Sequence, residues 1–90
     1  MNVEFTKNFD EGFGALPELL REKSRKTIDL FLRSCESRRY PKGLRIHRCG
    51  PFISLSVTLK HRIFVSTIAG GVRFVFIGDY GDADRYLKRQ

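Results

Sequence analysis

The side chains best suited to chemistry in this chain are arginines, histidines and tyrosines, and most lie in its second half. The stretch from Ser37 to Gly78 contains no aspartate or glutamate, yet it holds eight of the lysines and arginines and both histidines. We call it the acid-free stretch. Arginine binds a phosphate through two parallel hydrogen bonds, and histidine exchanges protons near neutral pH. The pattern favours a polyanionic partner, foremost RNA, or an acidic protein partner, over a merely soluble surface.

RNA is a substrate that these residue types can cleave, because it carries its own nucleophile, the 2′-hydroxyl. Cleavage then needs groups that position the phosphate, accept a proton, stabilise the developing charge and donate a proton. Arginine, histidine and tyrosine supply these functions, and tyrosine can also stack on a base. The residues therefore indicate RNA chemistry that requires no metal and no other cofactor.

Other reaction classes lack their motifs in this sequence. It contains no phosphate-binding P-loop, no nucleophile elbow and no zinc signature, and the glycines at Gly12 and Gly14 do not continue into a dinucleotide fingerprint. Asp79, Asp82 and Asp84 indicate a solvated turn rather than a metal site, because no other acid precedes them for more than forty residues. The two cysteines form no metal-binding pair, so we expect two free thiols.

Length and charge limit the organisation to a single domain, residues 1–90. Ninety residues suffice for one thin core, to which eight phenylalanines contribute. The first forty residues carry eight basic and seven acidic side chains, whereas the remaining fifty carry nine and three, so most of the net charge of +7 lies in the second half. No apolar run approaches the roughly 18 residues of a membrane span, and the start does not resemble a signal peptide. We expect a cytoplasmic protein without membrane contact.

The first half of the sequence predicts one short strand and two helices. Val3 and Phe5 alternate with polar neighbours, as in a strand. Phe9 and Phe13 have the spacing of a short helix. An amphipathic helix is predicted over residues 17–36, because apolar side chains return there at helical intervals. The segment from Pro41 to Gly43 interrupts the chain.

The second half predicts four strands and a last helical turn. Alternation from Ile53 to Leu59 indicates a strand with one buried face. Gly70 and Gly71 are predicted as a two-residue hairpin turn. The remaining expected elements are strands over 44–49, 62–69 and 72–77 and a helical turn over 83–89.

The predicted order, β-α-α-β-β-β-β, defines an α+β fold. Helices followed by a run of strands imply a small, mainly antiparallel sheet with both N-terminal helices packed on one face. The opposite face is expected to be open, with Ser54, Ser56 and Arg62 pointing out of it. The candidate RNA-binding surface therefore lies on that face.

Several short segments, in this order and spacing, resemble the RelE/ParE toxin superfamily over nearly the whole chain. These segments are Leu44–Arg48, Ile53–Val57, His61–Val65, Phe76–Tyr80 and Arg85–Tyr86. RelE-like members are mRNA endonucleases that act on the ribosome and are silenced by an antitoxin. The resemblance therefore implies the toxin of a bacterial type II toxin–antitoxin pair, with mRNA, the ribosome and an acidic antitoxin as partners. Two alternatives remain, a ParE-like toxin that inhibits DNA gyrase, and a non-toxic relative that binds RNA or an antitoxin.

The resemblance also implies site residues. Arg62 matches the family arginine that contacts the scissile phosphate, and Tyr86 matches a tyrosine that stacks or assists proton transfer. Tyr80 stands where many relatives carry arginine or histidine. Ser54 and Ser56 stand where RelE carries lysines, and we expect them to contact RNA.

The glutamate base of YoeB-like members has no counterpart in this sequence. His47 is the candidate proton acceptor in its place. Four further cations are candidate phosphate contacts: Arg45, Arg48, Lys60 and Arg73.

Overall fold

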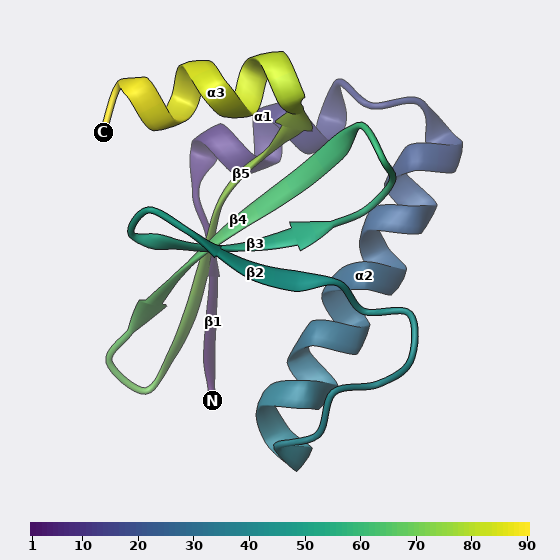
Figure 1. The fold of residues 1–90 in the computed structure, drawn as a ribbon, viewed down its shortest axis with the longest axis vertical. Helices are drawn as coiled ribbons and strands as arrows, with labels where there is room; N and C mark the ends of the chain where they lie inside the picture. Colours follow the sequence, from purple (N-terminus) through teal and green to yellow (C-terminus); the bar gives the residue numbers. More distant parts are fainter.

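The computed structural model describes all residues, 1–90, which form five strands and three helices, and Figure 1 shows their arrangement. In chain order the elements are β1 (Asn2–Phe5), α1 (Lys7–Gly14), α2 (Glu18–Ser37), β2 (Ile46–Cys49), β3 (Phe52–Ser56), β4 (His61–Ile68), β5 (Gly71–Asp79) and α3 (Tyr80–Lys88). The predicted α+β class and the order of its first seven elements are confirmed. The final turn is longer than expected, because α3 is a helix of nine residues.

The strands form one sheet in the order β1-β5-β4-β3-β2. Strand β1 pairs with β5 in parallel, and every other neighbouring pair is antiparallel. The chain leaves β1 and enters β2 at the same end of the sheet, after the two helices (Figure 1). Strand β2 therefore runs opposite to β1, and the three reversals that follow make β5 parallel to β1. The expected, mainly antiparallel sheet is therefore confirmed, with β4 at its centre.

Helices α1 and α2 cover one face of the sheet, as predicted. Phe9 of α1 and Phe31 of α2 join a buried cluster with Leu55, Ile63 and Phe74 from the strands, and each of these three strand residues is 0 % exposed. Gly12 allows α1 to approach closely, because a Cβ atom there would lie 2.7 Å from the carbonyl oxygen of Ile77. The pattern of Gly12 and Gly14 therefore has a packing explanation.

A β-bulge in β5 divides its apolar side chains between the two faces of the sheet. Val65 pairs with Phe74 and Phe64 pairs with Phe76, so Val75 is the extra residue. Its carbonyl oxygen accepts a hydrogen bond of 2.9 Å from the side chain of Asn8. The bulge therefore allows Phe74 to face the helices while Phe76, two residues later, faces the other way.

Two local predictions were wrong. Strand β3 ends at Ser56 rather than Leu59, because the Thr58 hydroxyl accepts hydrogen bonds from the backbone N–H groups of Lys60 and His61 and closes a turn. The hairpin turn is at Ala69 and Gly70, since Ile68 already pairs with Gly71. Gly70 has a φ of +72°, whereas Gly71 lies in β5, where a Cβ atom would be 1.8 Å from the Asn2 carbonyl oxygen of β1.

Helix α3 begins directly after β5 because Asp79 caps it. The Asp79 carboxylate accepts a hydrogen bond of 2.9 Å from the backbone N–H of Asp82. That hydrogen bond is the main reason why the pKa of Asp79 lies below its usual range. The cap directs α3 across the sheet face opposite α1 and α2. None of the three helices combines the length and the apolar character that crossing a membrane would require.

Candidate active site

The sheet face opposite α1 and α2 is only partly open. At one end Phe52, Phe64, Phe76 and Tyr86 pack their rings together, with centroid distances of 5.6 Å between Phe52 and Phe64 and 5.1 Å between Phe76 and Tyr86. We call these four residues the aromatic plug. Ala83 of α3 is buried against them. The expectation of an open face is therefore wrong at this end, because α3 and the plug cover it.

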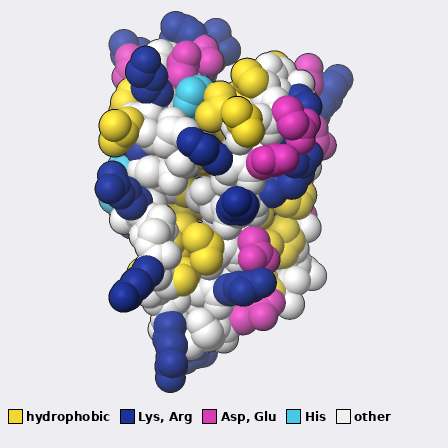
Figure 2. All heavy atoms as spheres, turned by 90° about the vertical axis from the view of Figure 1, so that its right-hand side faces the viewer, with side chains coloured by type: hydrophobic (Ala, Val, Ile, Leu, Met, Phe, Trp, Pro, Cys, Tyr) yellow, Lys and Arg dark blue, Asp and Glu magenta, His cyan; other side chains and the backbone are white.

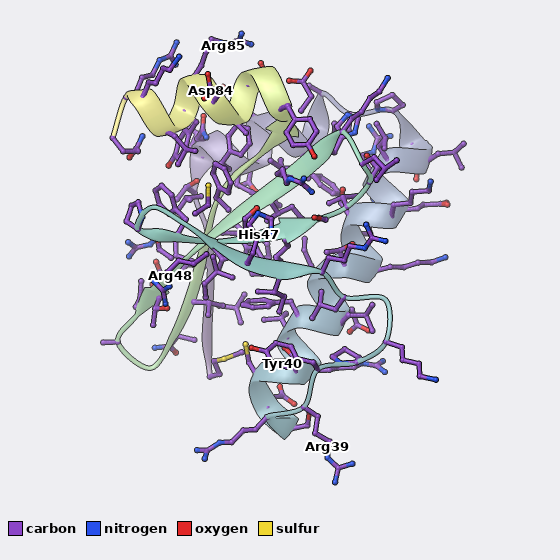
Figure 3. The ribbon with its side chains drawn as sticks, viewed as in Figure 1. Arg39, Tyr40, His47, Arg48, Asp84 and Arg85 are labelled. Atoms are coloured by element: carbon purple, nitrogen blue, oxygen red, sulfur yellow. The ribbon has the colours of Figure 1, made fainter.

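Beside the plug lies a hollow of about 390 Å³ between α3 and the strands, which we call the polar hollow. Its polar rim contains His47 from β2, Arg62 from β4, and Tyr80 and Asp84 from α3. Figure 3 shows His47 on β2 and Asp84 on α3. Its remaining lining residues are Cys49, Ser54, Phe64, Ala83 and Leu87. The hollow therefore brings together three of the four predicted catalytic residues.

Arg62 is the cation that this site holds most firmly. Its guanidinium donates one hydrogen bond to the Ser56 hydroxyl and another to the Tyr80 hydroxyl. The guanidinium carbon also lies 4.6 Å from the centroid of the Tyr80 ring, a cation–π contact. No carboxylate forms an ion pair with Arg62. Arg62 is therefore fixed in place with its charge available to an anion.

Ser54 and Ser56 have different surroundings, although both face away from α1 and α2. Ser56 is half-buried and accepts the hydrogen bond from Arg62. Ser54 is only 1 % exposed, and its hydroxyl has no hydrogen-bond partner in the protein. The prediction that Ser54 points out of an open face is wrong, since it lies at the floor of the polar hollow. An unpartnered buried hydroxyl is uncommon, because it loses its hydrogen bonds to water without replacement.

The cations of β2 and the chain before it point in more than one direction. His47 is exposed and lines the polar hollow. Arg48 lines a second hollow, of about 690 Å³, between β2 and the end of α2, which His47 also borders. Arg39 and Tyr40 line that second hollow too, and Figure 3 shows them at the far end of the molecule from Asp84. Arg45 is exposed just before β2.

The remaining predicted phosphate contacts, Lys60 and Arg73, differ in position. Lys60 is exposed in the turn that leads into β4, two residues before Arg62. Arg73 lies near the start of β5 and forms an ion pair of 2.8 Å with Glu4 of β1. Because Arg62 pairs with Gly78 near the other end of β5, Arg73 is distant from the polar hollow along the strand.

Tyr86 is the one predicted catalytic residue that the structure does not bring to the polar hollow. It belongs to the plug and borders a separate hollow with Asn8, Glu11 and Arg85. Burial raises the pKa of its hydroxyl. Its surroundings are therefore those of a packing side chain.

Sequence reasoning missed Asp84 as a residue of this site. Asp84 lines the rim of the polar hollow, and its side chain, which is 65 % exposed, forms an ion pair of 3.1 Å with Lys88, one turn further along α3. The available signal was the spacing of four residues from Tyr80, which places both side chains on one side of a helix. The structure contains no cluster of three or more histidine, cysteine or acidic side chains able to hold a metal ion. Cys35 and Cys49 are both free thiols.

Acidic and basic side chains are unevenly distributed over the surface. In Figure 2 acidic and basic side chains alternate on the right-hand side of the view, whereas the left-hand margin below the top carries only basic and histidine side chains among its charged groups. Five of the six ion pairs join residues outside the acid-free stretch, and the sixth involves Arg73. The other lysines and arginines of the acid-free stretch therefore form no ion pair within the chain.

Comparison with solved structures finds the same fold in two complexes and in one structure of YafQ. The RelB–RelE antitoxin–toxin complex from Methanococcus jannaschii matches with a TM-score of 0.70 and 14 % identity, covering 92 % of this chain and 96 % of that one. The DinJ–YafQ complex of E. coli matches with a TM-score of 0.70 and 11 % identity, covering 90 % and 94 %. YafQ from E. coli strain BL21(DE3) matches with a TM-score of 0.60 and 10 % identity, covering 91 % and 96 %.

Sequence comparisons give no match, either to a family model or to a curated protein. The likeness is therefore one of structure, and it extends over more than nine tenths of the chain in two of the three cases. The chain has the fold of the RelE and YafQ toxins, which confirms the structural side of the resemblance seen in the sequence.

Proposed function

We propose that this chain, which has the fold of the RelE and YafQ toxins, is the toxin of a type II toxin–antitoxin pair. In this proposal it cleaves mRNA on the ribosome, as an endoribonuclease that needs no metal. The observation that carries the proposal is Arg62, which Ser56 and Tyr80 hold at the polar hollow and which forms no ion pair with an acid. A fixed and unpaired guanidinium is suited to bind a phosphate and to stabilise charge that develops on it.

The reaction is an attack of the 2′-oxygen on the adjacent phosphorus. The proton of the 2′-hydroxyl passes to His47, the histidine of the hollow. Arg62 stabilises the negative charge on the phosphoryl oxygens as the bond from phosphorus to the 5′-oxygen breaks. The departing 5′-oxygen takes the hydroxyl proton of Tyr80, which lies beside the guanidinium. The products are a 2′,3′-cyclic phosphate and a free 5′-hydroxyl.

The other site residues have supporting roles in this proposal. Ser56 positions Arg62 through its hydroxyl. Lys60 and Arg45 are exposed on either side of β3 and are suited to bind flanking phosphates. Arg48 faces away from the hollow and Arg73 is paired with Glu4, so we assign neither of them to the scissile phosphate.

An acidic antitoxin is the partner that we propose for this chain. The RelE and YafQ structures similar to it include complexes with the antitoxins RelB and DinJ. A net charge of +7 would attract an acidic protein over a distance, and its binding would cover the cations that contact RNA. Co-purification with the product of a small acidic neighbouring gene would test this partner.

The substitution Arg62→Ala tests the cleavage proposal. We expect cleavage to slow by about two orders of magnitude, the usual cost of removing one group that stabilises the transition state, and growth arrest to be relieved. Primer extension on a reporter mRNA would show discrete cuts with the unchanged protein. Arg73→Ala is the matched control, because it removes an exposed arginine of the same sheet at a distance from the hollow. Equal cleavage by both variants would contradict the assignment of Arg62.

A ParE-like inhibitor of DNA gyrase without catalysis is the second candidate. One observation favours it, because Tyr86, a predicted catalytic residue, packs in the plug and does not line the polar hollow that contains Arg62. The same expression experiment distinguishes the two functions. Intact reporter mRNA together with a DNA-damage response would favour gyrase inhibition over cleavage.

A further inference from the structure

The polar hollow contains groups that a phosphate does not need. Arg62 and Tyr80 suffice to bind the phosphate, yet Asp84, Ser54 and an apolar floor line the same space. These groups suggest a second part of the ligand, and the inference drawn from them rests on the proposed function. The part of an RNA strand next to a phosphate is the nucleotide's own sugar and base.

Asp84 is the first indication of a base. It is the only acid that lines the polar hollow. A carboxylate repels phosphate, so its presence beside Arg62 weakens a site built for phosphate alone. A carboxylate accepts hydrogen bonds and donates none when ionised. Asp84 is therefore suited to a ligand group with N–H donors, which nucleobases carry and phosphates lack.

The floor of the hollow is the second indication. Phe64 and Ala83 line it but are almost completely buried, so Leu87, which is half-buried, supplies its accessible apolar surface. Single-stranded RNA is commonly recognised by bases that leave the stack and are held in pockets of the protein. Ser54 adds a buried hydroxyl that no protein group satisfies. This hydroxyl is able to donate to or accept from a base edge.

The spacing within α3 fits one nucleotide. Tyr80, which contacts Arg62, and Asp84 are separated by one helical turn, a rise of about 6 Å. A phosphate at Arg62 and a base at Asp84 would thus lie in neighbouring positions of the same hollow. Lys88 pairs with the Asp84 carboxylate at 3.1 Å, and this contact limits the positions that the carboxylate adopts.

The donor pattern of the four bases selects one of them. A carboxylate binds best to two parallel donors, as it does with arginine. On its Watson–Crick edge guanine offers two adjacent donors, the ring N1–H and the exocyclic amine. Adenine and cytosine offer an amine next to an acceptor, and uracil offers a single N–H between two acceptors. Only guanine offers a donor to each oxygen of Asp84, and the oxygen paired with Lys88 can accept a second hydrogen bond because a carboxylate oxygen has two lone pairs.

We propose that the polar hollow is a guanine-binding subsite, in which Asp84 reads the base by two hydrogen bonds while Arg62 binds the adjoining phosphate. Leu87 contacts the base, and Ser54 forms a further hydrogen bond to it. The subsite would give the protein a preference for cleaving next to guanosine.

Binding of the four nucleoside 5′-monophosphates, measured by NMR titration of the unbound chain, tests this proposal. We expect the guanosine nucleotide to bind at least about fivefold more tightly than the other three, the discrimination typical of one good bidentate contact. Asp84→Asn should abolish the preference, because an asparagine presents one acceptor and one donor. Asp82→Asn is the matched control, since Asp82 borders a different hollow on the same helix. Equal binding of all four nucleotides, or no binding of any, would overturn the proposal.

Mapping of cleavage positions separates this proposal from the proposed function. If the protein cuts RNA without preference for guanosine and Asp84→Asn cuts at the same positions, the subsite is refuted and the nuclease stands. If the guanosine nucleotide binds selectively and Asp84→Asn loses that selectivity while no RNA is cut, the subsite stands and the nuclease is refuted.

Discussion

The two ends of the sheet face opposite α1 and α2 differ in how the protein fills them. At the aromatic plug, four rings and Ala83 exclude water, and Phe64 is 2 % exposed. At the polar hollow the same helix, α3, leaves space lined by charged and polar side chains, and one buried hydroxyl has no partner. The plug maximises packing, whereas the hollow keeps polar groups that would lower the stability of a folded chain lacking a ligand.

The two tyrosines of α3 show how one helix serves both ends. Tyr80 and Tyr86 are six residues apart, a rotation of roughly 240° about the helix axis, so they point to different sides. Tyr80 is 52 % exposed and contacts Arg62, whereas Tyr86 packs on Phe76. Residue type alone does not distinguish them, and the difference shows that position on the helix decides between packing and chemistry.

The largest effect on stability is expected at the plug. Phe64→Ala removes a ring that packs on Phe52, Phe76 and Tyr86, and we expect the free energy of unfolding to fall by about 3–5 kcal/mol. Tyr80→Ala, in the hollow, should lower it by less than about 1 kcal/mol, because an exposed cation–π contact contributes little. Urea unfolding followed by circular dichroism measures both variants.

A domain of this size has only about 5–13 kcal/mol of stability in total, so Phe64→Ala could prevent folding. Phe64→Leu is then the informative variant, since it keeps most of the apolar volume and should cost less. If Tyr80→Ala lowered the free energy of unfolding as much as either Phe64 variant, the contrast between the aromatic plug and the polar hollow would be contradicted.

A smaller effect is expected at the junction of the two ends, where β5 meets α3. A Cβ atom on Gly78 would lie 2.8 Å from the ring of Phe76 and 3.1 Å from Cβ of Asp82, so Gly78→Ala must displace the plug or the helix. We expect it to cost about 1–3 kcal/mol, as overpacking does. Gly81→Ala is the control, because its Cβ would meet nothing closer than 3.5 Å and alanine favours a helix by up to about 1 kcal/mol. Thermal unfolding that ranks Gly81→Ala as the more damaging variant would contradict this account.

Much of the fold was predictable from the sequence because its signals are local. The apolar periodicity of α2 gave its bounds to within one residue, and the break at Pro41 to Gly43 separated the helices from the strands. The alternation after Ile53 was a weaker guide, since the hydroxyl of Thr58 closes a turn while the pattern continues to Leu59. The bulge at Val75 has no local signal, because it depends on pairing with β4 and on Asn8.

The site was predictable in part. Arg62 was identifiable from the resemblance and from its position at the start of a strand, and His47 from the lack of any nearby acid. The burial of Ser54 could not be predicted, because the sequence indicated only a helical turn over 83–89. The structure has a helix, α3, that already begins at Tyr80 and helps to enclose the hollow. Asp84 was missed because the three late acids indicated a solvated turn, and the assignment of Tyr86 came from the resemblance and stays a prediction. The Asp79 cap sets where α3 begins.

At Ser54, in contrast to the positions above, removing a side-chain group should increase the stability. Ser54→Ala removes a hydroxyl that is buried without a partner, so we expect the free energy of unfolding to rise by about 1 kcal/mol in the unbound chain. Ser56→Ala is the control, and it should lower stability slightly because it removes the acceptor of a hydrogen bond from Arg62. Urea unfolding gives the free energy of unfolding of both variants, and the midpoints are comparable when the free energy depends on urea with the same slope. A loss of stability in Ser54→Ala would mean that its hydroxyl is satisfied in solution, and the contrast with the plug would then weaken.

The smallest effect is expected at Tyr86, where it depends on pH. Burial raises the pKa of Tyr86 in the folded chain above its value of about 10 in an unfolded one. The folded state therefore holds this proton more tightly, so stability does not depend on the group below pH ~10 and falls as the pH rises through the folded pKa. Tyr86→Phe should match the unchanged protein at pH 7 and lose less stability at higher pH, measured by urea unfolding across that range. Tyr40→Phe, which alters a side chain that is 79 % exposed, should follow the unchanged protein at every pH. If Tyr86→Phe instead retained its stability but lost RNA cleavage, Tyr86 would belong to the chemistry of the hollow and the division of α3 into a packing side and a reactive side would fail.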